Sequence, residues 1–87
     1  MINIKILSYK SPQRYAVKQT LLAARNALRK THPNFDISIT EVKDLVEMEE
    51  YTNVVIYPSL VINEKLVCIG RFPKKEEVIG WLQQAME

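Results

Sequence analysis

The stretch YPSLVINEKLVCIGRFPKKEEV, residues 57–78, decides the fold. Two β-prone runs flank Asn63-Glu64-Lys65, and asparagine tolerates the left-handed backbone of a tight turn. Pro58 cannot donate a hydrogen bond to a sheet, so we expect the first of these strands to begin at Ser59. The stretch therefore predicts an antiparallel hairpin that ends at Gly70.

The first third of the chain predicts a strand followed by a long helix. Apolar and polar residues alternate over residues 2–6, as in a strand with a buried face. Serine caps helices well and proline suits their first turn, so Ser11 and Pro12 predict the start of a helix. We expect this helix to run to about Lys30. Its buried face is expected to carry Val17, Leu21, Ala24 and Leu28.

The middle of the chain predicts a second strand and a short helix. Alternation over residues 35–40 indicates a strand with one polar face, which suits a sheet edge. Asp44 and Glu47, which are three residues apart, resemble a capping box. The helix that they start is expected to reach about Tyr51 and to bury Leu45 and Met48.

The last element is expected to be a helix that begins at Pro73. Gly80 inside this helix costs roughly 1 kcal/mol against alanine, which suggests close packing at that position. The element order is therefore βαβαββα, with a parallel pair of strands, a right-handed crossover and a hairpin. The buried side of the last helix is expected to carry Val78, Trp81, Leu82 and Ala85.

Length and composition predict a single domain over residues 1–87. Hydrophobic residues make up 47% and charged residues 25%, which argues against a disordered chain. No apolar run approaches the roughly 18 residues of a membrane helix, and residues 1–10 lack the order of a signal peptide. The single cysteine, Cys68, cannot form an internal disulfide. A cytoplasmic location is expected.

The charges are unevenly spread although the net charge is only +2. Residues 1–35 carry seven cations and no acid, whereas residues 36–50 carry six acids and one lysine. This asymmetry fits an acidic partner or, more commonly, oppositely charged elements of one domain. A basic stripe within about 60° on the first helix favours a solvated face over a protein partner and over nucleic acid. The stripe consists of Arg14, Lys18, Arg25 and Arg29.

A helix directly after the first strand and a proline directly before the third resemble the thioredoxin fold. The small thioredoxin/glutaredoxin-like proteins are the most similar. This resemblance implies a four-stranded mixed sheet of order 2-1-3-4 with helices on both faces, the first and last on the same face. It also implies that Pro58 is the family's cis-proline, with Tyr57 open to an extended ligand, and that Gly70 follows the fourth strand.

The sequence differs from the family pattern at the C-x-x-C motif. In KILSYKSPQR, residues 5–14, Ser11 and Arg14 occupy the two cysteine positions. Thiol–disulfide exchange needs an attacking thiolate and a resolving thiol, and neither residue supplies one. We therefore expect no dithiol oxidoreductase activity, and a redox-inactive domain that binds a protein or peptide through the former active-site edge. The expected binding residues are Lys10, Ser11, Arg14, Tyr57, Pro58 and Arg71.

Two alternatives from the enzyme class stay open. A glutathione-related enzyme or carrier would use Ser11 and the groove beside Pro58, and a redox protein would act through Cys68. Buried strand cysteines are usually small hydrophobes. His32 lies about 30 Å from Ser11 along the helix, so a Ser–His pair is excluded. One cysteine and one distant histidine do not form a zinc site, and no metal or cofactor is expected.

Overall fold

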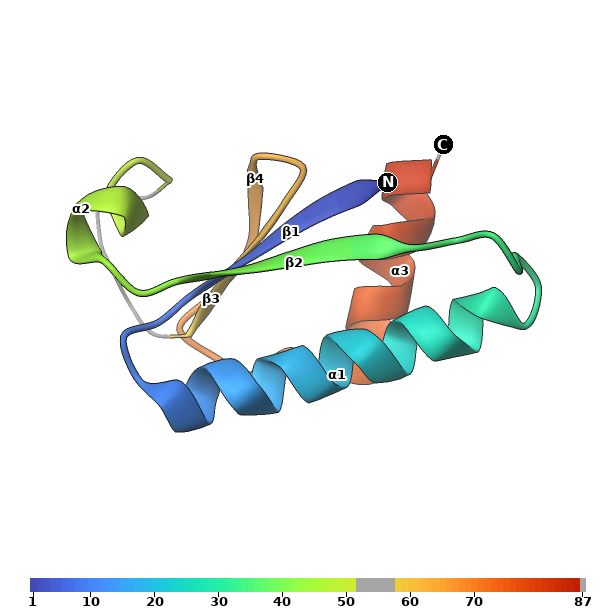
Figure 1. Ribbon diagram of the computed structural model, residues 1–87, viewed down its shortest axis with the longest axis horizontal. Helices are drawn as coiled ribbons and strands as arrows, with labels where there is room; N and C mark the ends of the chain where they lie inside the picture. Colours follow the sequence, from blue (N-terminus) through green and yellow to red (C-terminus); the bar gives the residue numbers. More distant parts are fainter. Residues whose placement is uncertain (52–57, 87) are drawn as a thin grey trace.

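The computed structural model describes residues 1–51 and 58–86 (Figure 1). The observed element order is the predicted βαβαββα. None of the helices in this described part combines the length and apolarity that a membrane-spanning segment needs. The elements are β1 (Ile2–Leu7), α1 (Ser11–Arg29), β2 (Ile37–Val42), α2 (Leu45–Met48), β3 (Ser59–Ile62), β4 (Lys65–Ile69) and α3 (Lys75–Met86).

The sheet has the predicted strand order, β2-β1-β3-β4. β1 pairs in parallel with β2, whereas β3 is antiparallel to both β1 and β4. The hairpin turns at Asn63 and Glu64, whose φ angles are 48° and 68°. Two consecutive left-handed residues are typical of the tight turn that matches the twist of paired strands. The prediction of a left-handed Asn63 is therefore confirmed.

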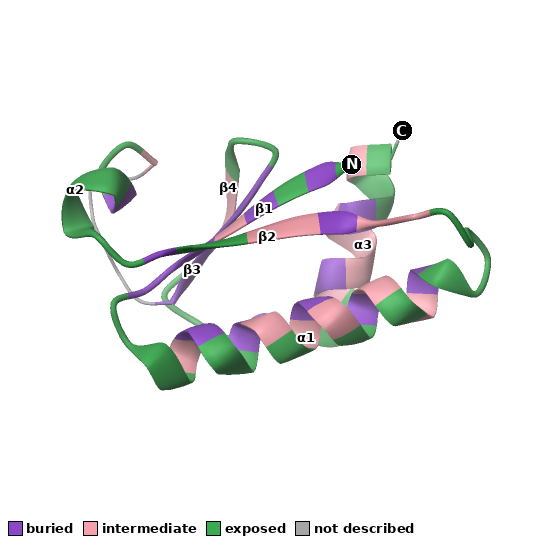
Figure 2. Cartoon of the chain, viewed as in Figure 1, coloured by how far each residue is buried: buried purple, intermediate pink, exposed green. Residues whose placement is uncertain are grey.

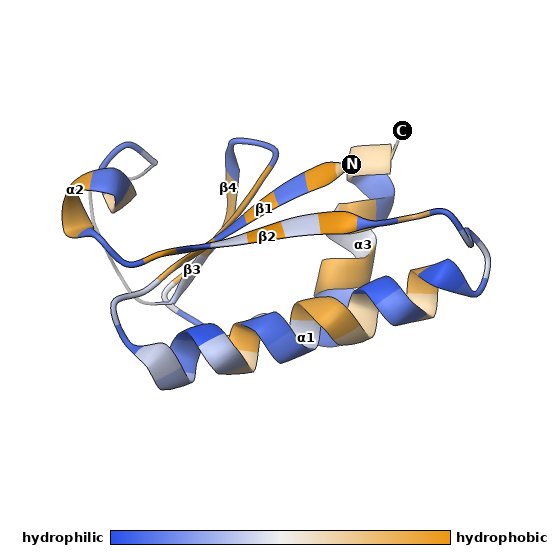
Figure 3. Ribbon diagram, viewed as in Figure 1, coloured by the Kyte–Doolittle hydropathy of each residue, from blue (hydrophilic) through white to orange (hydrophobic). Residues whose placement is uncertain are grey.

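The helices cover both faces of the sheet, as predicted (Figure 1). α1 and α3 share one face, where Ile4 and Ile6 of β1 pack with Leu21 and Leu82 in the main core cluster. Figure 2 shows the buried positions of α1 turned toward this layer, and Figure 3 shows how hydrophobic and hydrophilic positions alternate along β1. On the opposite face, Met48 of α2 belongs to a smaller buried cluster.

α2 is shorter than predicted. The backbone N–H groups of Glu50 and Tyr51 donate to carbonyls only three residues back, so the α-helical pattern ends at Met48. Asp44 caps the helix by accepting from the N–H of Val46 over 3.1 Å. Met48 is fully buried but Leu45 is 49% exposed, so the prediction that Leu45 is buried was wrong. One helical turn places only Met48 over the sheet.

α3 begins at Lys75 rather than at Pro73, because its first helical hydrogen bond runs from Val78 N–H to the carbonyl of Lys74. Trp81 is partly buried and packs against the main core, as predicted. The predicted close packing at Gly80 is wrong: apart from its chain neighbours and the nearby backbone of α3 itself, no atom of the described residues lies within 4 Å of the place where a Cβ would stand. Gly80 thus carries the entropic cost of glycine without a packing gain.

Three of the four residues of the basic stripe on α1 form ion pairs within the domain. Arg25 and Arg29 approach the carboxylate of Asp36, just before β2, at 3.8 and 3.3 Å. Arg14 pairs with Glu41 of β2 at 3.0 Å. Part of the charge asymmetry of the sequence therefore reflects ion pairs between the basic helix α1 and two acids on or just before β2.

Replacing Gly80 with alanine should raise the free energy of unfolding by about 0.5–1 kcal/mol, because alanine loses less backbone entropy and its Cβ meets open space. Urea denaturation of the two proteins measures this difference. Gly70→Ala is the matched control, and it should be destabilising because Gly70 has a φ of 70°. A loss of stability in Gly80→Ala would contradict the open environment of this residue.

Candidate functional site

One end of the sheet brings together those predicted site residues that the structure describes. The register aligns Leu7 of β1 with Val42 of β2 and with Ser59 of β3, and it aligns Ser59 with Ile69 of β4. The loops that leave β1, β2 and β4 therefore lie beside the start of β3. We call this end of the molecule, from Leu7 across to Ile69 with its attached loops, the carboxyl edge.

Pro58 and Gly70 meet at the carboxyl edge. The N–H of Gly70 donates to the carbonyl of Pro58 over 2.9 Å, and Pro58 is buried. Arg71 follows directly, which places it beside Pro58. Tyr57 and the predicted cis bond between Tyr57 and Pro58 lie outside the described residues.

The junction between β1 and α1 differs from the prediction that Ser11 caps the helix. The carbonyl of Lys10 already accepts from Arg14 N–H over 3.1 Å, so Lys10 is the N-cap residue and Ser11 the first helical residue. No side chain caps the first turn, and Ser11 is exposed. The predicted serine cap is therefore wrong, because the helix begins one residue earlier than the Ser-Pro pattern indicates.

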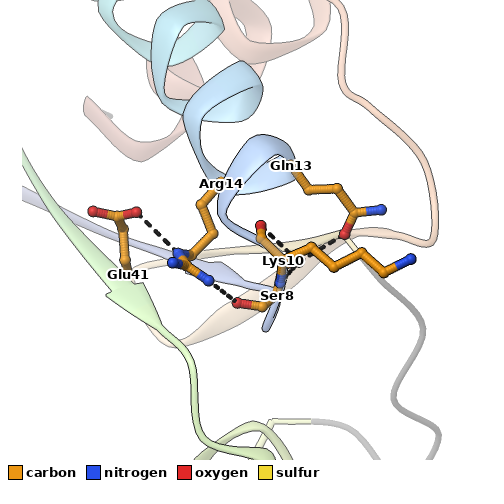
Figure 4. A network of polar contacts seen from close by, with 5 residues as sticks. All are labelled: Ser8, Lys10, Gln13, Arg14 and Glu41. Carbon is orange, nitrogen blue, oxygen red and sulfur yellow. Dashed lines mark hydrogen bonds and ion pairs between the residues drawn. The ribbon is translucent and has the colours of Figure 1, made fainter.

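Ser8 is a residue that the sequence reasoning missed. Its side chain is fully buried, and its Oγ accepts from Lys10 N–H over 3.0 Å and donates to Gln13 Oε1 over 2.6 Å (Figure 4). These bonds tie the loop to the first turn of α1. The position of a serine directly after a buried strand was the one available signal, and serine hydroxyls commonly bond to backbone nearby in the chain.

Arg14 is buried beneath the same loop. Its side chain is 9% exposed, with Nη1 donating to the Ser8 carbonyl and Nε to Glu41 Oε1, both over 3.0 Å (Figure 4). Arg14 was expected to be a binding residue together with Lys10 and Arg71, but its guanidinium points into the fold. Arg14 lies three residues before Val17, and this helical spacing already indicated the buried face.

Arg71 is exposed but paired with Glu77. The guanidinium makes two hydrogen bonds to this carboxylate, over 2.7 and 2.6 Å, and Lys74 N–H adds a third over 3.1 Å. The Arg71 hydrogen bonds, followed by that from Lys74 N–H, lower the pKa of Glu77 to about 2. Much of the charge of Arg71 is therefore balanced within the loop that joins β4 to α3.

Cys68 is 3% exposed, and its Sγ donates to the carbonyl of Arg71 over 3.4 Å. Burial is the main cause of a raised pKa for this thiol, and the nearby Arg71 charge opposes it only in part. A redox-active cysteine needs an accessible thiolate. Burial of Cys68 and the raised pKa of its thiol both disfavour an accessible thiolate.

Most of the exposed large apolar side chains of the described residues lie toward the carboxyl edge, on elements that cover both faces of the sheet. Six of the eight large hydrophobic residues that are exposed in the described chain belong to its loops or to the adjoining strand end and helix starts. The other two, Met1 and Met86, line a hollow at the opposite end of the sheet. The six are Tyr9, Tyr15, Leu45, Val46, Ile69 and Phe72.

Titration of Glu77 tests the contact with Arg71. Its folded-state pKa of about 2 lies below the ordinary 4.5, so the pair stabilises the fold above about pH 4.5 and this contribution is lost as the pH falls toward 2. The carboxyl carbon of Glu77, followed by NMR, should titrate near pH 2 in the wild type and closer to 4.5 in Arg71→Gln. Lys75→Gln serves as the control and should leave the midpoint unchanged. An equal midpoint in Arg71→Gln would show that another group lowers the pKa.

The sequence matches a family model described as a thioredoxin domain over residues 2–83. No significant match to a curated protein was found. The matched residues include all four strands, α1 and most of α3, so the match covers the same elements that build the sheet and its main core. The chain therefore belongs to the thioredoxin-domain family.

Proposed function

We propose that this thioredoxin domain binds a protein or peptide through its carboxyl edge and does not reduce disulfides. The observation that carries the proposal is that six of the eight exposed large hydrophobic side chains of the described residues belong to this end of the molecule. Large apolar side chains that cluster on an otherwise polar surface are typical of interaction sites, and aromatic residues are enriched there. Tyr9 and Phe72, in the loops after β1 and β4, are the expected central contacts.

The chemistry at the two family cysteine positions supports a binding role over a redox role. Ser11 is exposed but has only a hydroxyl, and Arg14 is buried in contacts with Ser8 and Glu41. Neither side chain can form the mixed disulfide that thiol exchange requires. Cys68 is the one thiol in the chain, and its burial works against a role as the nucleophile.

The charges at the carboxyl edge favour an apolar partner segment over a small anionic thiol such as glutathione. Arg14 and Arg71, two of the three predicted cations, are paired with Glu41 and Glu77. Lys10 makes no ion pair with any described residue, and its Nζ lies 5.8 Å from the centroid of the Tyr9 ring. The edge thus offers exposed aromatic side chains beside the ammonium group of Lys10, which suits an apolar segment with a nearby carboxylate.

Disulfide reduction should stay at the background rate. The assay is reduction of insulin disulfides by dithiothreitol with and without the protein, followed by turbidity. Cys68→Ser is the informative control: it should give the same background rate as the wild type, because the buried thiol takes no part. A rate above background that disappears in Cys68→Ser would show instead a redox protein acting through this cysteine.

Partner binding should depend on the aromatic side chains of the carboxyl edge. In affinity purification from the native cell, the double variant Tyr9→Ser/Phe72→Ser should lose its specific partner, with roughly a tenfold or greater loss of affinity once that partner is purified. Both side chains are more than half exposed, so the variant should keep its fold. Circular dichroism checks this condition.

Met86→Ser is the matched control, because Met86 is an exposed hydrophobic residue at the opposite end. It should retain the partner. Equal recovery of the partner by the double variant would refute binding through the carboxyl edge. Calorimetry with glutathione separates the remaining alternative, since tight binding of glutathione is expected only of a thiol-related enzyme or carrier.

A further inference from the structure

A pocket of about 210 Å³ lies between the β3–β4 hairpin and α3. Its walls include Ile62 and Val67 of the hairpin and Trp81 of α3, and all three also pack against the main core. The pocket lies toward the end of the sheet opposite the carboxyl edge, because Asn63 in its lining donates its N–H to the Asn3 carbonyl near the start of β1. It is therefore separate from the proposed protein-binding surface.

A β-bulge builds one wall of this pocket. In the pairing of β3 with β4, Leu60 faces Cys68 and Val61 faces Leu66, so Val67 is the extra residue. Val67 and Cys68, although consecutive, both pack toward the α1 and α3 layer, whereas Leu66 packs on the other face. Bulges re-aim single side chains in this way and often lie beside functional sites. Here the bulge turns Val67 toward α3.

The rim of the pocket carries polar side chains, including a cation. Lys65 and Gln84 are both exposed and both line the pocket. The neighbouring carboxylate of Glu64 is engaged with Lys5 over 3.2 Å, and Lys65 makes no ion pair with any residue of the described ranges. Asn63 holds the rim in place, because its Oδ1 accepts from Asn3 N–H over 2.9 Å.

We propose that this pocket binds a small aromatic carboxylate. An aromatic ring would pack against Trp81 and Val67, and the carboxylate would face the ammonium group of Lys65, with the Gln84 amide as a second donor. The volume is sufficient, because an apolar protein cavity of about 150 Å³ accommodates benzene. The combination of apolar walls with a few polar groups at the rim is typical of small-molecule sites.

Trp81 is the only tryptophan in the chain, so its indole N–H gives a single NMR resonance that reports on the pocket. Addition of 2-naphthoate should shift this resonance saturably, with a Kd on the order of 1 mM for a ligand of this size. The neutral isostere 2-naphthamide should bind about three- to tenfold more weakly, because it lacks the charge that Lys65 attracts. Both measurements use the wild-type protein.

Variants assign the effect to the lysine. Lys65→Met should weaken binding of 2-naphthoate about three- to tenfold and leave binding of 2-naphthamide unchanged. Lys75→Met, which removes an exposed lysine outside the pocket lining, is the matched control and should change neither. Any of three results would overturn the proposal: equal affinity for the two probes, an unchanged affinity of Lys65→Met for 2-naphthoate, or no saturable shift of the Trp81 indole resonance up to about 10 mM 2-naphthoate. None of these results bears on binding at the carboxyl edge.

Discussion

The buried guanidinium of Arg14 joins three parts of the fold. It extends from α1, donates to the carbonyl of Ser8 after β1, and pairs with Glu41 of β2. Ser8 N–H in turn donates to the carbonyl of Val42 over 3.2 Å. A buried carbonyl or charge without a partner costs about 1–3 kcal/mol or more, so the loop, the helix start and the edge strand depend on one another. The exposed side chain of Tyr9 extends from this braced loop.

Arg14 has a structural role in this chain. The resemblance to the family implies the second cysteine of C-x-x-C at this position, and here the side chain reaches under the loop to an acid on β2. Two arginines of α1 pair with acids on or just before β2: Arg14 with Glu41, and Arg29 with Asp36. The contacts of Arg14 hold the loop between β1 and α1 in place.

The sequence predicted most of the fold because its signals were local and mutually consistent. Alternating isoleucines, the Pro58 boundary and the Asn63 turn each specified an element, whereas the strand order of the sheet followed from the family resemblance and was confirmed. The failures depend on contacts that a local pattern cannot show. Ser11 is not the N-cap, because α1 begins one residue earlier than predicted and Lys10 is its N-cap residue. Gly80 faces open space although glycine in a helix usually indicates a close neighbour.

The candidate site was less predictable than the fold. The structure places Pro58 next to Gly70, as in the family that the sequence resembles. Arg14 is buried although it is charged. Its spacing of three residues from Val17 was the sequence signal for burial, and its charge argued against it. The Arg71–Glu77 contact joins residues across a loop and a helix start, and its geometry depends on how the chain turns after Gly70. Side-chain pairs of this kind are decided by tertiary packing.

The bulge at Val67 has a consequence for self-association. β4 is one of the two outer strands, and an outer strand with a regular ladder is a template on which another chain can add, which leads to aggregation. The extra residue interrupts the spacing of hydrogen-bonding groups along β4 and increases its twist. β2, the other outer strand, pairs with β1 in an unbroken register over six residues. Intermolecular strand addition is therefore disfavoured at β4, and β2 is the side from which an extended sheet would grow.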